Sequence, residues 1–251
     1  MRFLLSPAKK MNQDTDSLPW QDLPRFLPQA EQLWQAMGQM DAAALQALWK
    51  CNDRIAEQNV QRLHTGSLRA GLTPAILAYE GIAFQYMAPS VFTLEQFDYV
   101  QEHLRILSGL YGVLRPFDGV TPYRLEMQAR LSVGGAKDLY AFWGNRLATA
   151  LWEETDCIVN LASQEYSRCV SRFPVTGKRF ITCVFGEEKD GKVVEKGTLC
   201  KMARGEMVRF AAEKAVTRPE QLKEFHRHYR FVQERSTETE YVFLRTGEWL
   251  V

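Results

Sequence analysis

Apolar residues follow two patterns along this chain: short continuous runs, and longer stretches with helical spacing. Arg2–Leu5 is a short apolar run that predicts a strand, and the strand is expected to end at Ser6-Pro7 because proline cannot donate to a strand ladder. Most of residues 27–104 repeat apolar positions every three or four residues, which predicts several amphipathic helices. The expected N-cap residues of these helices are Asp41, Asn52 or Asp53, and Thr93, whose helix is predicted to run through Leu104.

The second half of the chain mixes the two patterns. An amphipathic helix is predicted from Asp138 through Leu151, and the apolar run at 157–161 predicts a buried strand. Asp190-Gly191 is typical of a tight turn joining strands at 180–185 and 193–199, and residues 201–215 are expected to be helical. Residues 229–232 and 241–244 look like closing strands. A regular alternation of strand and helix is missing, so the predicted class is α+β, a mixed sheet surrounded by many helices.

Length and composition fit one intracellular domain. At 251 residues the chain is near the upper limit for a single hydrophobic core, and it contains no internal repeat or evident linker, so one domain over residues 1–251 is expected. The five cysteines are odd in number and form no CxxC, which indicates reduced thiols in the cytoplasm and predicts no metal site. No apolar run is long enough for a signal peptide or a membrane span, so no membrane association is expected. No cofactor is expected either.

Positive charge is concentrated late in the chain. The net charge is only +1, but residues 161–230 carry 15 basic and 9 acidic groups, a net charge of +6. Clustered positive charge is typical of proteins that bind polyanions, although lysines and arginines that merely solvate helix faces give the same count. Charge alone leaves both interpretations open.

Two glycines three residues apart lie between apolar stretches, at Gly109 and Gly112. A Gly-x-x-Gly turn that opens a helix presents free N–H groups to a phosphate, which is the principle of a helix-hairpin-helix element. Arg105 before the turn and Arg115 after it supply charge for such a contact. The residues by themselves favour an ordinary turn, because turn glycines far outnumber phosphate-binding ones.

Polar residues at the ends of two predicted strands form a second candidate site. Lys9 follows the first strand, and Asn160 and Ser163 follow the strand at 157–161. Such strand ends often line clefts, although Ser163 is also a natural N-cap for the next helix. The predicted polar cluster consists of Ser6, Arg124, Glu126, Asn160, Ser163 and Glu165, with Lys9 beside it. Ser-His-Asp order, a P-loop and HExxH are all missing, so a non-enzymatic role is favoured over catalysis.

Several separated motifs resemble one family. They are the segment Leu4–Lys9, residues Asn59 and Arg62, the Ala-Ile-Leu-Ala at 75–78, the long segment Leu104–Met127, residues 137–144, residues 160–166, and Lys201 with 203–205. Together they resemble the YaaA family of bacterial peroxide-stress proteins. The resemblance implies resistance to hydrogen peroxide, limitation of free intracellular iron, and sequence-independent binding of duplex or branched DNA through a basic cleft and a helix-hairpin-helix element.

The resemblance also assigns candidate residues. The predicted DNA-binding residues are Lys9, Arg105, Gly109, Leu110, Tyr111, Gly112, Arg115, Lys201, Arg204 and Arg209. The alternative is an enzyme of unknown reaction, or a small-molecule site, in the polar cleft around Lys9, Arg124 and Glu165. The chain departs from the family pattern at Gly81-Ile82-Ala83-Phe84, where an acid and a hydroxyl are missing, and at Gln164, where an Asp is usual.

Overall fold

The strand predicted at Arg2–Leu5 is confirmed as β1, and it lies inside the main sheet between β8 and β5. The structure is a computed structural model that describes residues 1–247. The strand order is β11-β12-β9-β8-β1-β5-β6, and β10 pairs with β9. Strands β1, β5, β8, β9 and β12 pair parallel with one another, whereas β6, β10 and β11 pair antiparallel with β5, β9 and β12. The sheet is therefore mixed, and the predicted α+β class is confirmed.

The remaining strands of this sheet have the following bounds: β5 Leu104–Ser108, β6 Gly112–Leu114, β8 Cys157–Asn160, β9 Arg179–Lys189, β10 Lys192–Val194, β11 Tyr229–Phe231 and β12 Glu240–Arg245. Two small sheets pair β2 (Lys10–Met11) with β4 (Tyr79–Glu80), and β3 (Thr73–Pro74) with β7 (Gly119–Val120).

The helices have these bounds: α1 Leu27–Gly38, α2 Ala42–Trp49, α3 Asp53–Thr65, α4 Ala75–Ala78, α5 Ile82–Met87, α6 Leu94–His103, α7 Leu139–Trp143, α8 Arg146–Glu154, α9 Gln164–Ser171 and α10 Gly197–Glu213. Short 3₁₀ helices cover Pro89–Val91, Pro219–Glu224 and Gln233–Arg235.

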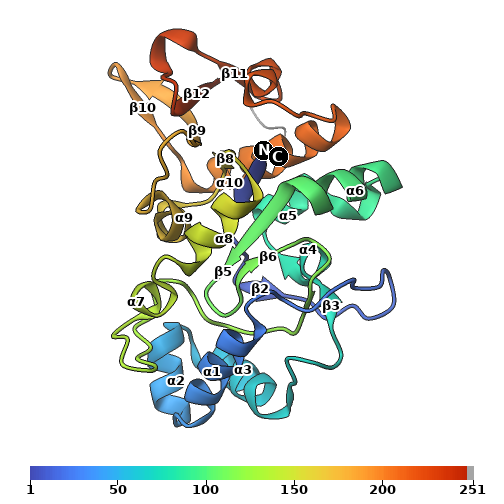
Figure 1. The fold of residues 1–251 in the computed structure, drawn as a ribbon, viewed down its shortest axis with the longest axis vertical. Coiled ribbons are helices and arrows are strands. Elements are labelled where there is room, and N and C mark those ends of the chain that lie inside the picture. The colour runs from blue at the N-terminus through green and yellow to red at the C-terminus, as the bar shows by residue number, and fades with distance from the viewer. Residues whose placement is uncertain (248–251) are drawn as a thin grey trace.

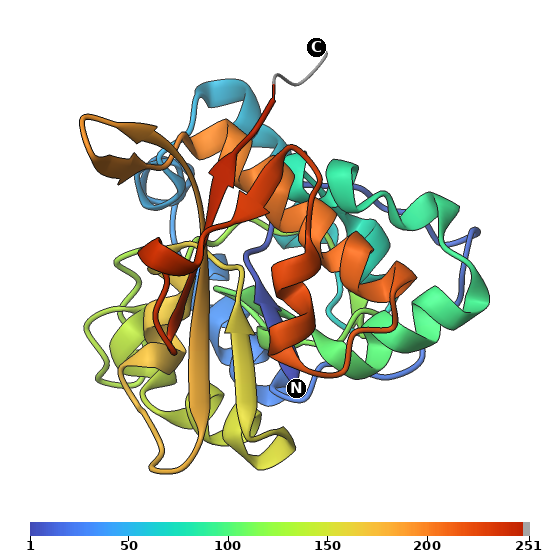
Figure 2. The same ribbon diagram turned by 90° about the horizontal axis from the view of Figure 1, so that it is seen from above.

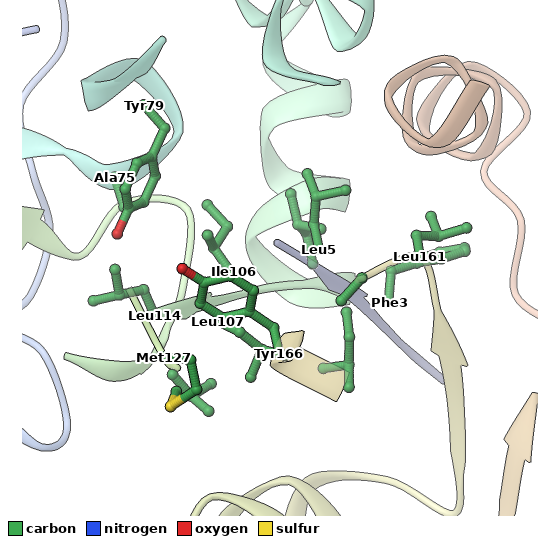
Figure 3. Packing of buried hydrophobic residues seen from close by; sticks show 14 of the residues in the cluster. Phe3, Leu5, Ala75, Tyr79, Ile106, Leu107, Leu114, Met127, Leu161 and Tyr166 are labelled. Carbon is green, nitrogen blue, oxygen red and sulfur yellow. The ribbon is translucent and has the colours of Figure 1, made fainter. Parts of the chain in front are cut away.

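The helices cover the sheet and extend one end of the molecule. In Figure 1, α1, α2 and α3 gather at the end opposite β10, β11 and β12. Helices α5, α6 and α10 lie together on one side of the sheet (Figure 2). The core between these layers is apolar on both faces of the central strands, so that Phe3, Leu4 and Leu5 are all buried. Figure 3 shows the ring of Tyr166 near Ile106 and Leu107 in this core.

Helix starts follow the sequence closely, because short polar side chains satisfy the free N–H groups of a first turn. The side chains of Asp41, Asn52 and Thr93 accept from Ala44, Ile55 and Gln96 at the predicted starts. Asp138 also caps its helix as predicted. The helix itself is interrupted at Gly144, whose φ of +52° ends α7 before α8 begins.

Two predicted boundaries are wrong. The helix that begins at Thr93 ends at His103, and residues 104–108 form strand β5. The strand expected at 193–199 ends at Val194, and α10 begins at Gly197. In the first case a short apolar run buried on both faces fits either period, so spacing alone does not separate helix from strand. The turn at Asp190-Gly191 is confirmed, with φ of 52° and 71°.

The predicted helix-hairpin-helix element is a β-hairpin. Strands β5 and β6 pair antiparallel with Ser108 opposite Gly112, and Gly109, Leu110 and Tyr111 form the loop. Ser108 Oγ accepts from the N–H of Tyr111 at 2.8 Å, and Gly112 has a φ of +73°. This is the three-residue hairpin geometry with a glycine in the left-handed region. Leu110 and Tyr111 are fully buried, so the turn faces the core instead of solvent.

Candidate functional site

A pocket opens where strands β1 and β8 end. Both strands run parallel, so their carboxyl ends meet at the same edge of the sheet. The chain adds β5 on one side of β1 and later β8 on the other, so the order of connection reverses at β1. Crevices at such reversals are the usual ligand sites of open parallel sheets. The cavity here has a volume of about 400 Å³.

The pocket collects side chains from five regions of the chain. Its walls are formed by Leu5–Lys10, Glu80–Phe84, Tyr123–Glu126, Leu161 with Ser163, Glu165 and Tyr166, and finally Lys201 with Arg204. All members of the predicted polar cluster line this cavity except Asn160, and Lys9 lines it too.

Ser6 and Ser163 join the ends of β1 and β8. Ser163 donates its N–H to Ser6 Oγ at 2.8 Å, and Ser6 Oγ donates to Ser163 Oγ at 3.2 Å. Ser163 lies at the N-cap of α9 as predicted, but its hydroxyl makes no capping hydrogen bond. The pair therefore holds the two strand ends together and leaves hydroxyl groups at the pocket wall.

Glu126 lies between two cations. Its Oε2 is 3.0 Å from Lys9 Nζ, and its Oε1 accepts from Arg124 Nη2 at 3.2 Å. Arg124 is only 10% exposed and also donates to the carbonyl of Trp49 at 3.4 Å. The buried guanidinium is thus neutralised by one carboxylate, which fixes the position of both groups.

Glu165 occupies the first turn of α9 in a different environment. Its Oε1 accepts from the N–H of Gln128 at 3.3 Å, and no cation forms a salt bridge with it among residues 1–247. Burial raises the pKa of Glu165, and the nearby charge of Glu126 raises it further, while the Gln128 N–H partly opposes the rise. Two neighbouring carboxylates with different surroundings are a frequent arrangement for proton transfer.

Helix α10 brings two more cations to the pocket. Its interior Gly205 lies so close to α5 that a Cβ there would be 2.0 Å from the carbonyl oxygen of Ala83. This close crossing sets Lys201 and Arg204 beside the wall formed by Gly81–Phe84. Arg204 Nη2 is 3.4 Å from Glu195, and its buried Nε has no hydrogen-bond partner among the described residues. Lys201 is exposed and makes no salt bridge within residues 1–247.

The glycine of the buried hairpin has a role at this site. A Cβ on Gly109 would lie 2.3 Å from the carbonyl oxygen of Leu125 and 3.1 Å from the carbonyl carbon of Glu126. The absence of a side chain at residue 109 therefore lets the segment that carries Arg124 and Glu126 pass directly against the hairpin. Trp143 Nε1 donates to the carbonyl of Gly109 at 3.1 Å and anchors the same turn.

Buried hydroxyl groups lie beneath the pocket. Tyr123 lines it, and the Tyr123 hydroxyl lies 2.6 Å from Ser108 Oγ and 2.9 Å from the hydroxyl of Tyr79. Burial raises the pKa of Tyr123 to about 12, so the phenol is neutral at physiological pH. The chain of hydroxyls links the pocket wall to the hairpin turn, where Ser108 accepts from Tyr111.

Apolar side chains make up the rest of the wall. Ile82 and Phe84, where this chain departs from the family pattern, both line the pocket. Both side chains are apolar, so this part of the wall offers a ligand no polar side chain. The other departure, Gln164, is exposed at the start of α9.

Several predicted DNA-binding residues lie away from this pocket. Arg105 is 5% exposed and donates to Glu154 at 2.7 Å and to three backbone carbonyls. Arg115 pairs with Asp22 and with buried Asp118, whose pKa burial raises to about 6 against the opposing effect of Arg115. Arg105 is thus buried in a structural ion pair, whereas Arg115 is partly exposed and paired with two carboxylates.

The other predicted site residues that lie outside the pocket also make contacts within the fold. Gly109, Leu110, Tyr111 and Gly112 are buried in the hairpin, as described above. Arg209 pairs with Glu213 at 2.8 Å on the side of α10 that does not line the pocket. Asn160 is buried and accepts from the N–H of Ala162 at 3.0 Å, which shapes the turn after β8. Of the predicted DNA-binding set, Lys9, Lys201 and Arg204 line the pocket.

Sequence reasoning noted Gly81–Phe84 only as a departure from the family pattern and Gly109 only as a turn glycine. It did not predict that residues 81–84 line the pocket, or that Gly109 and Gly205 permit close packing. Gly205 carried a usable signal, because a glycine inside a helix is costly and commonly marks a close helix contact. Within residues 1–247 no three His, Cys, Asp or Glu side chains are placed to hold a metal ion. None of the described helices has the length and hydropathy needed to cross a membrane.

The fold and site define a class: a mixed, largely parallel sheet with a polar pocket at the point where the strand order reverses. Residues 1–235 match the family model described as "Peroxide stress protein YaaA". The chain therefore belongs to the peroxide stress protein YaaA family.

Individual relatives agree with this assignment. A UPF0246 protein of Agathobacter rectalis is 51% identical over 98% of this chain and 99% of its own length. A UPF0246 protein of Lachnoclostridium phytofermentans is 49% identical over 98% and 96% of the two chains. A third, from Desulfitobacterium hafniense, is 47% identical over 98% of each. The family match over residues 1–235 covers every segment that contributes to the pocket.

Proposed function

We propose that this protein acts in the peroxide stress response by binding a small organic anion in the pocket at the ends of β1 and β8. The observation that carries the proposal is the convergence of side chains from five separate regions in one cavity of about 400 Å³. Lys201 makes no salt bridge within residues 1–247, and Arg204 has one long contact there, 3.4 Å to Glu195, so both supply positive charge to the pocket. An anionic ligand satisfies these groups, because charge-assisted hydrogen bonds are the strong ones.

The same pocket has the groups needed for acid–base chemistry. Glu126 is held between Lys9 and Arg124, whereas Glu165 is half-buried with a raised pKa and no ion pair among the described residues. A raised pKa makes the ionised carboxyl a stronger proton acceptor than an ordinary glutamate. We therefore assign Glu165 as the proton-exchanging group and Glu126 as the fixed charge.

Thermal-shift measurements with a panel of organic anions test the binding proposal. Sugar phosphates, nucleotides and dicarboxylates are added to the wild type, to the double variant Lys201→Gln/Arg204→Gln, and to Lys192→Gln. Lys192 is exposed in β10 and does not line the pocket, so it controls for the loss of charge. At least one anion is expected to raise the Tm of the wild type and of Lys192→Gln but not of the double variant. An equal response in all three proteins contradicts the proposal.

The cellular role is tested in a strain that lacks the gene. The wild-type chain is expected to restore survival in hydrogen peroxide, and Lys192→Gln is expected to do the same. The pocket double variant is expected to fail although it accumulates to the same level. Full rescue by the pocket variant would separate the peroxide response from the pocket.

DNA binding is a second candidate, supported by the exposed cations at the pocket rim. Lys9, Lys10 and Lys201 are exposed there, and residues 161–230 carry the excess of basic groups. Cations on such a face would contact phosphates, which position a protein on DNA without reading its sequence. The buried hairpin takes no part in this version of the hypothesis.

A gel-shift series with duplex and branched DNA at rising salt tests this candidate. Binding through phosphates is expected to weaken steeply with salt, because counterions are released. Lys9→Gln/Lys201→Gln is expected to weaken binding to all sequences alike, while Lys192→Gln has little effect. Binding that is missing at low salt, or that does not respond to salt, excludes this candidate.

A further inference from the structure

The pocket contains charged groups of both signs, and they come from different elements. The cations Lys201 and Arg204 belong to α10, and the carboxylates Glu126 and Glu165 belong to the segment 123–126 and to α9. Glu126 is already paired with Lys9 and Arg124. Lys10 and Glu80, which also line the pocket, pair with each other at 2.7 Å. The groups that remain for a ligand are therefore a pair of cations on α10 and the carboxyl of Glu165.

A phosphate fits the α10 pair better than a single carboxylate does. Arg204 has only one long contact, 3.4 Å to Glu195, and Lys201 has no salt bridge among residues 1–247. Arginine presents a planar set of donors that matches phosphate oxygens, and a nearby lysine adds a second charge. A phosphate monoester carries close to two negative charges at pH 7, which these two cations balance.

The apolar wall of the pocket favours a ligand with a ring between the group that binds the α10 cations and the group that binds Glu165. Leu5, Ile82, Phe84, Leu125 and Tyr166 all line the cavity. Leu5, Phe84, Leu125 and Tyr166 are each at most 7% exposed and Ile82 is partly exposed, so the apolar wall offers a ligand a narrow surface. A planar aromatic ring covers such a surface, whereas a bare phosphate or a sugar phosphate does not. The cavity volume of about 400 Å³ is within the range of pockets that enclose drug-sized ligands.

Two further features point to the class of ring. The pocket lies where the strand order reverses, which is the position at which open parallel sheets bind nucleotides. The Glu165 carboxyl accepts a long backbone hydrogen bond from Gln128 at 3.3 Å and interacts with the N–H of Met127. An ionised carboxylate has about four acceptor positions, so it retains capacity to accept from an amino group on a base.

Resting on the proposed function, we infer that the ligand is a free nucleoside monophosphate whose base carries an amino group. Its phosphate binds Lys201 and Arg204, its ring lies against Phe84 and Leu125, and its amino group donates to Glu165. Adenosine 5′-monophosphate is the simplest probe of this class.

Calorimetric titration with four probes tests each part of the assignment. The probes are adenosine 5′-monophosphate, inosine 5′-monophosphate without the amino group, adenosine without the phosphate, and ribose 5-phosphate without the base. The first is expected to bind at least tenfold more tightly than each of the others. Equal affinity for ribose 5-phosphate or for the inosine compound overturns the assignment.

Variants separate the two polar ends. Arg204→Gln is expected to weaken adenosine 5′-monophosphate at least tenfold and to leave adenosine unchanged, while Arg204→Lys recovers part of the affinity. Glu165→Gln is expected to reduce the preference for the adenosine over the inosine compound. Lys192→Gln controls for charge, and circular dichroism confirms that each variant is folded. Equal losses for adenosine and its monophosphate in Arg204→Gln would overturn the placement of the phosphate.

Competition distinguishes a free nucleotide from one within a strand. A 5′-phosphorylated tetramer of deoxyadenosine is expected to displace adenosine 5′-monophosphate poorly, and tighter binding of the tetramer would overturn the inference. Failure of the nucleotides, together with binding of another anion that depends on Lys201 and Arg204, would overturn this inference and keep the proposed function. Failure of every anion in the panel would overturn both.

Discussion

The hairpin of β5 and β6 and the neighbouring pocket differ in how completely their polar groups are hydrogen-bonded. In the hairpin, Arg105 donates to Glu154 and to three carbonyls, and Ser108 binds both Tyr111 and Tyr123. In the pocket, Arg204 has a buried Nε without a partner among the described residues, and Glu165 has no salt bridge there. Satisfied buried groups stabilise a fold, whereas groups left without partners are costly and are typical of sites that await a ligand.

The residues that identify the family are therefore not all residues that could contact a ligand. The segment Leu104–Met127 gave the clearest resemblance, yet its first half is structural support. Its second half carries Arg124 and Glu126 to the pocket, and Gly109 lets that half pass the hairpin. Leu104–Met127 thus combines a structural hairpin with a segment that lines the pocket.

The substitution Gly109→Ala is expected to have the largest effect. The new Cβ would lie 2.3 Å from a backbone oxygen. Because the clash is with the backbone, a change of side-chain rotamer cannot relieve it. We expect a loss of about 3–5 kcal/mol in the free energy of unfolding, measured with chemical denaturant. Gly38→Ala is the matched control, because nothing lies within 4 Å of a Cβ there, and it should gain about 0.5–1 kcal/mol as a helical alanine. Similar small effects in both proteins would refute the close-packing explanation.

Glu126→Gln is expected to be the next in size. It removes the charge that neutralises buried Arg124 and exposed Lys9, at 3.2 and 3.0 Å. Removing one partner of a buried ion pair leaves the other uncompensated, so we expect a loss of about 2–4 kcal/mol. Denaturant unfolding at pH 7 measures it. A neutral result would show that Arg124 finds another partner.

Glu165→Gln is expected to act in the opposite direction. The folded protein raises the pKa of Glu165 above its ordinary value of 4.5, so the folded state binds this proton more tightly than the unfolded chain does. The stability from this group is complete below pH 4.5 and is lost as the pH rises through the folded-state pKa.

The uncharged glutamine avoids that loss. The variant should therefore match the wild type at low pH and exceed it at pH 7, by no more than about 1 kcal/mol because the site is partly open to solvent. Tm measured across the pH range provides the test. A variant that is less stable than the wild type at pH 7 would mean that the carboxylate is stabilising in the folded state.

Lys201→Gln is expected to have the smallest effect on stability. The side chain is exposed and forms no salt bridge within residues 1–247, so the change should stay within about 0.5 kcal/mol. Ligand binding should nevertheless weaken, which titration of the variant and of Lys192→Gln compares directly. A loss of stability without a loss of binding would place Lys201 in the scaffold instead of the site.

The sequence predicted local structure well where local chemistry determines it. Strand β1, the N-caps at Asp41 and Asn52 and the Asp190-Gly191 turn are all correct, because a cap or a turn depends on a few adjacent residues. The error at 104–108 arose where spacing was ambiguous and burial decided. The resemblance identified the family correctly. It also implied a helix-hairpin-helix element, and the structure has a β-hairpin at that position.

By itself, then, the sequence determined the family, the α+β class and most of the polar residues that meet in the pocket. Only the tertiary structure decided which charges are free. Arg105 and Arg204 are indistinguishable as letters, yet one is enclosed by Glu154 and carbonyl groups and the other lines a cavity. The physical reason is that the cost of a charge depends on its partners and its access to water, and both are set by segments that are distant along the chain.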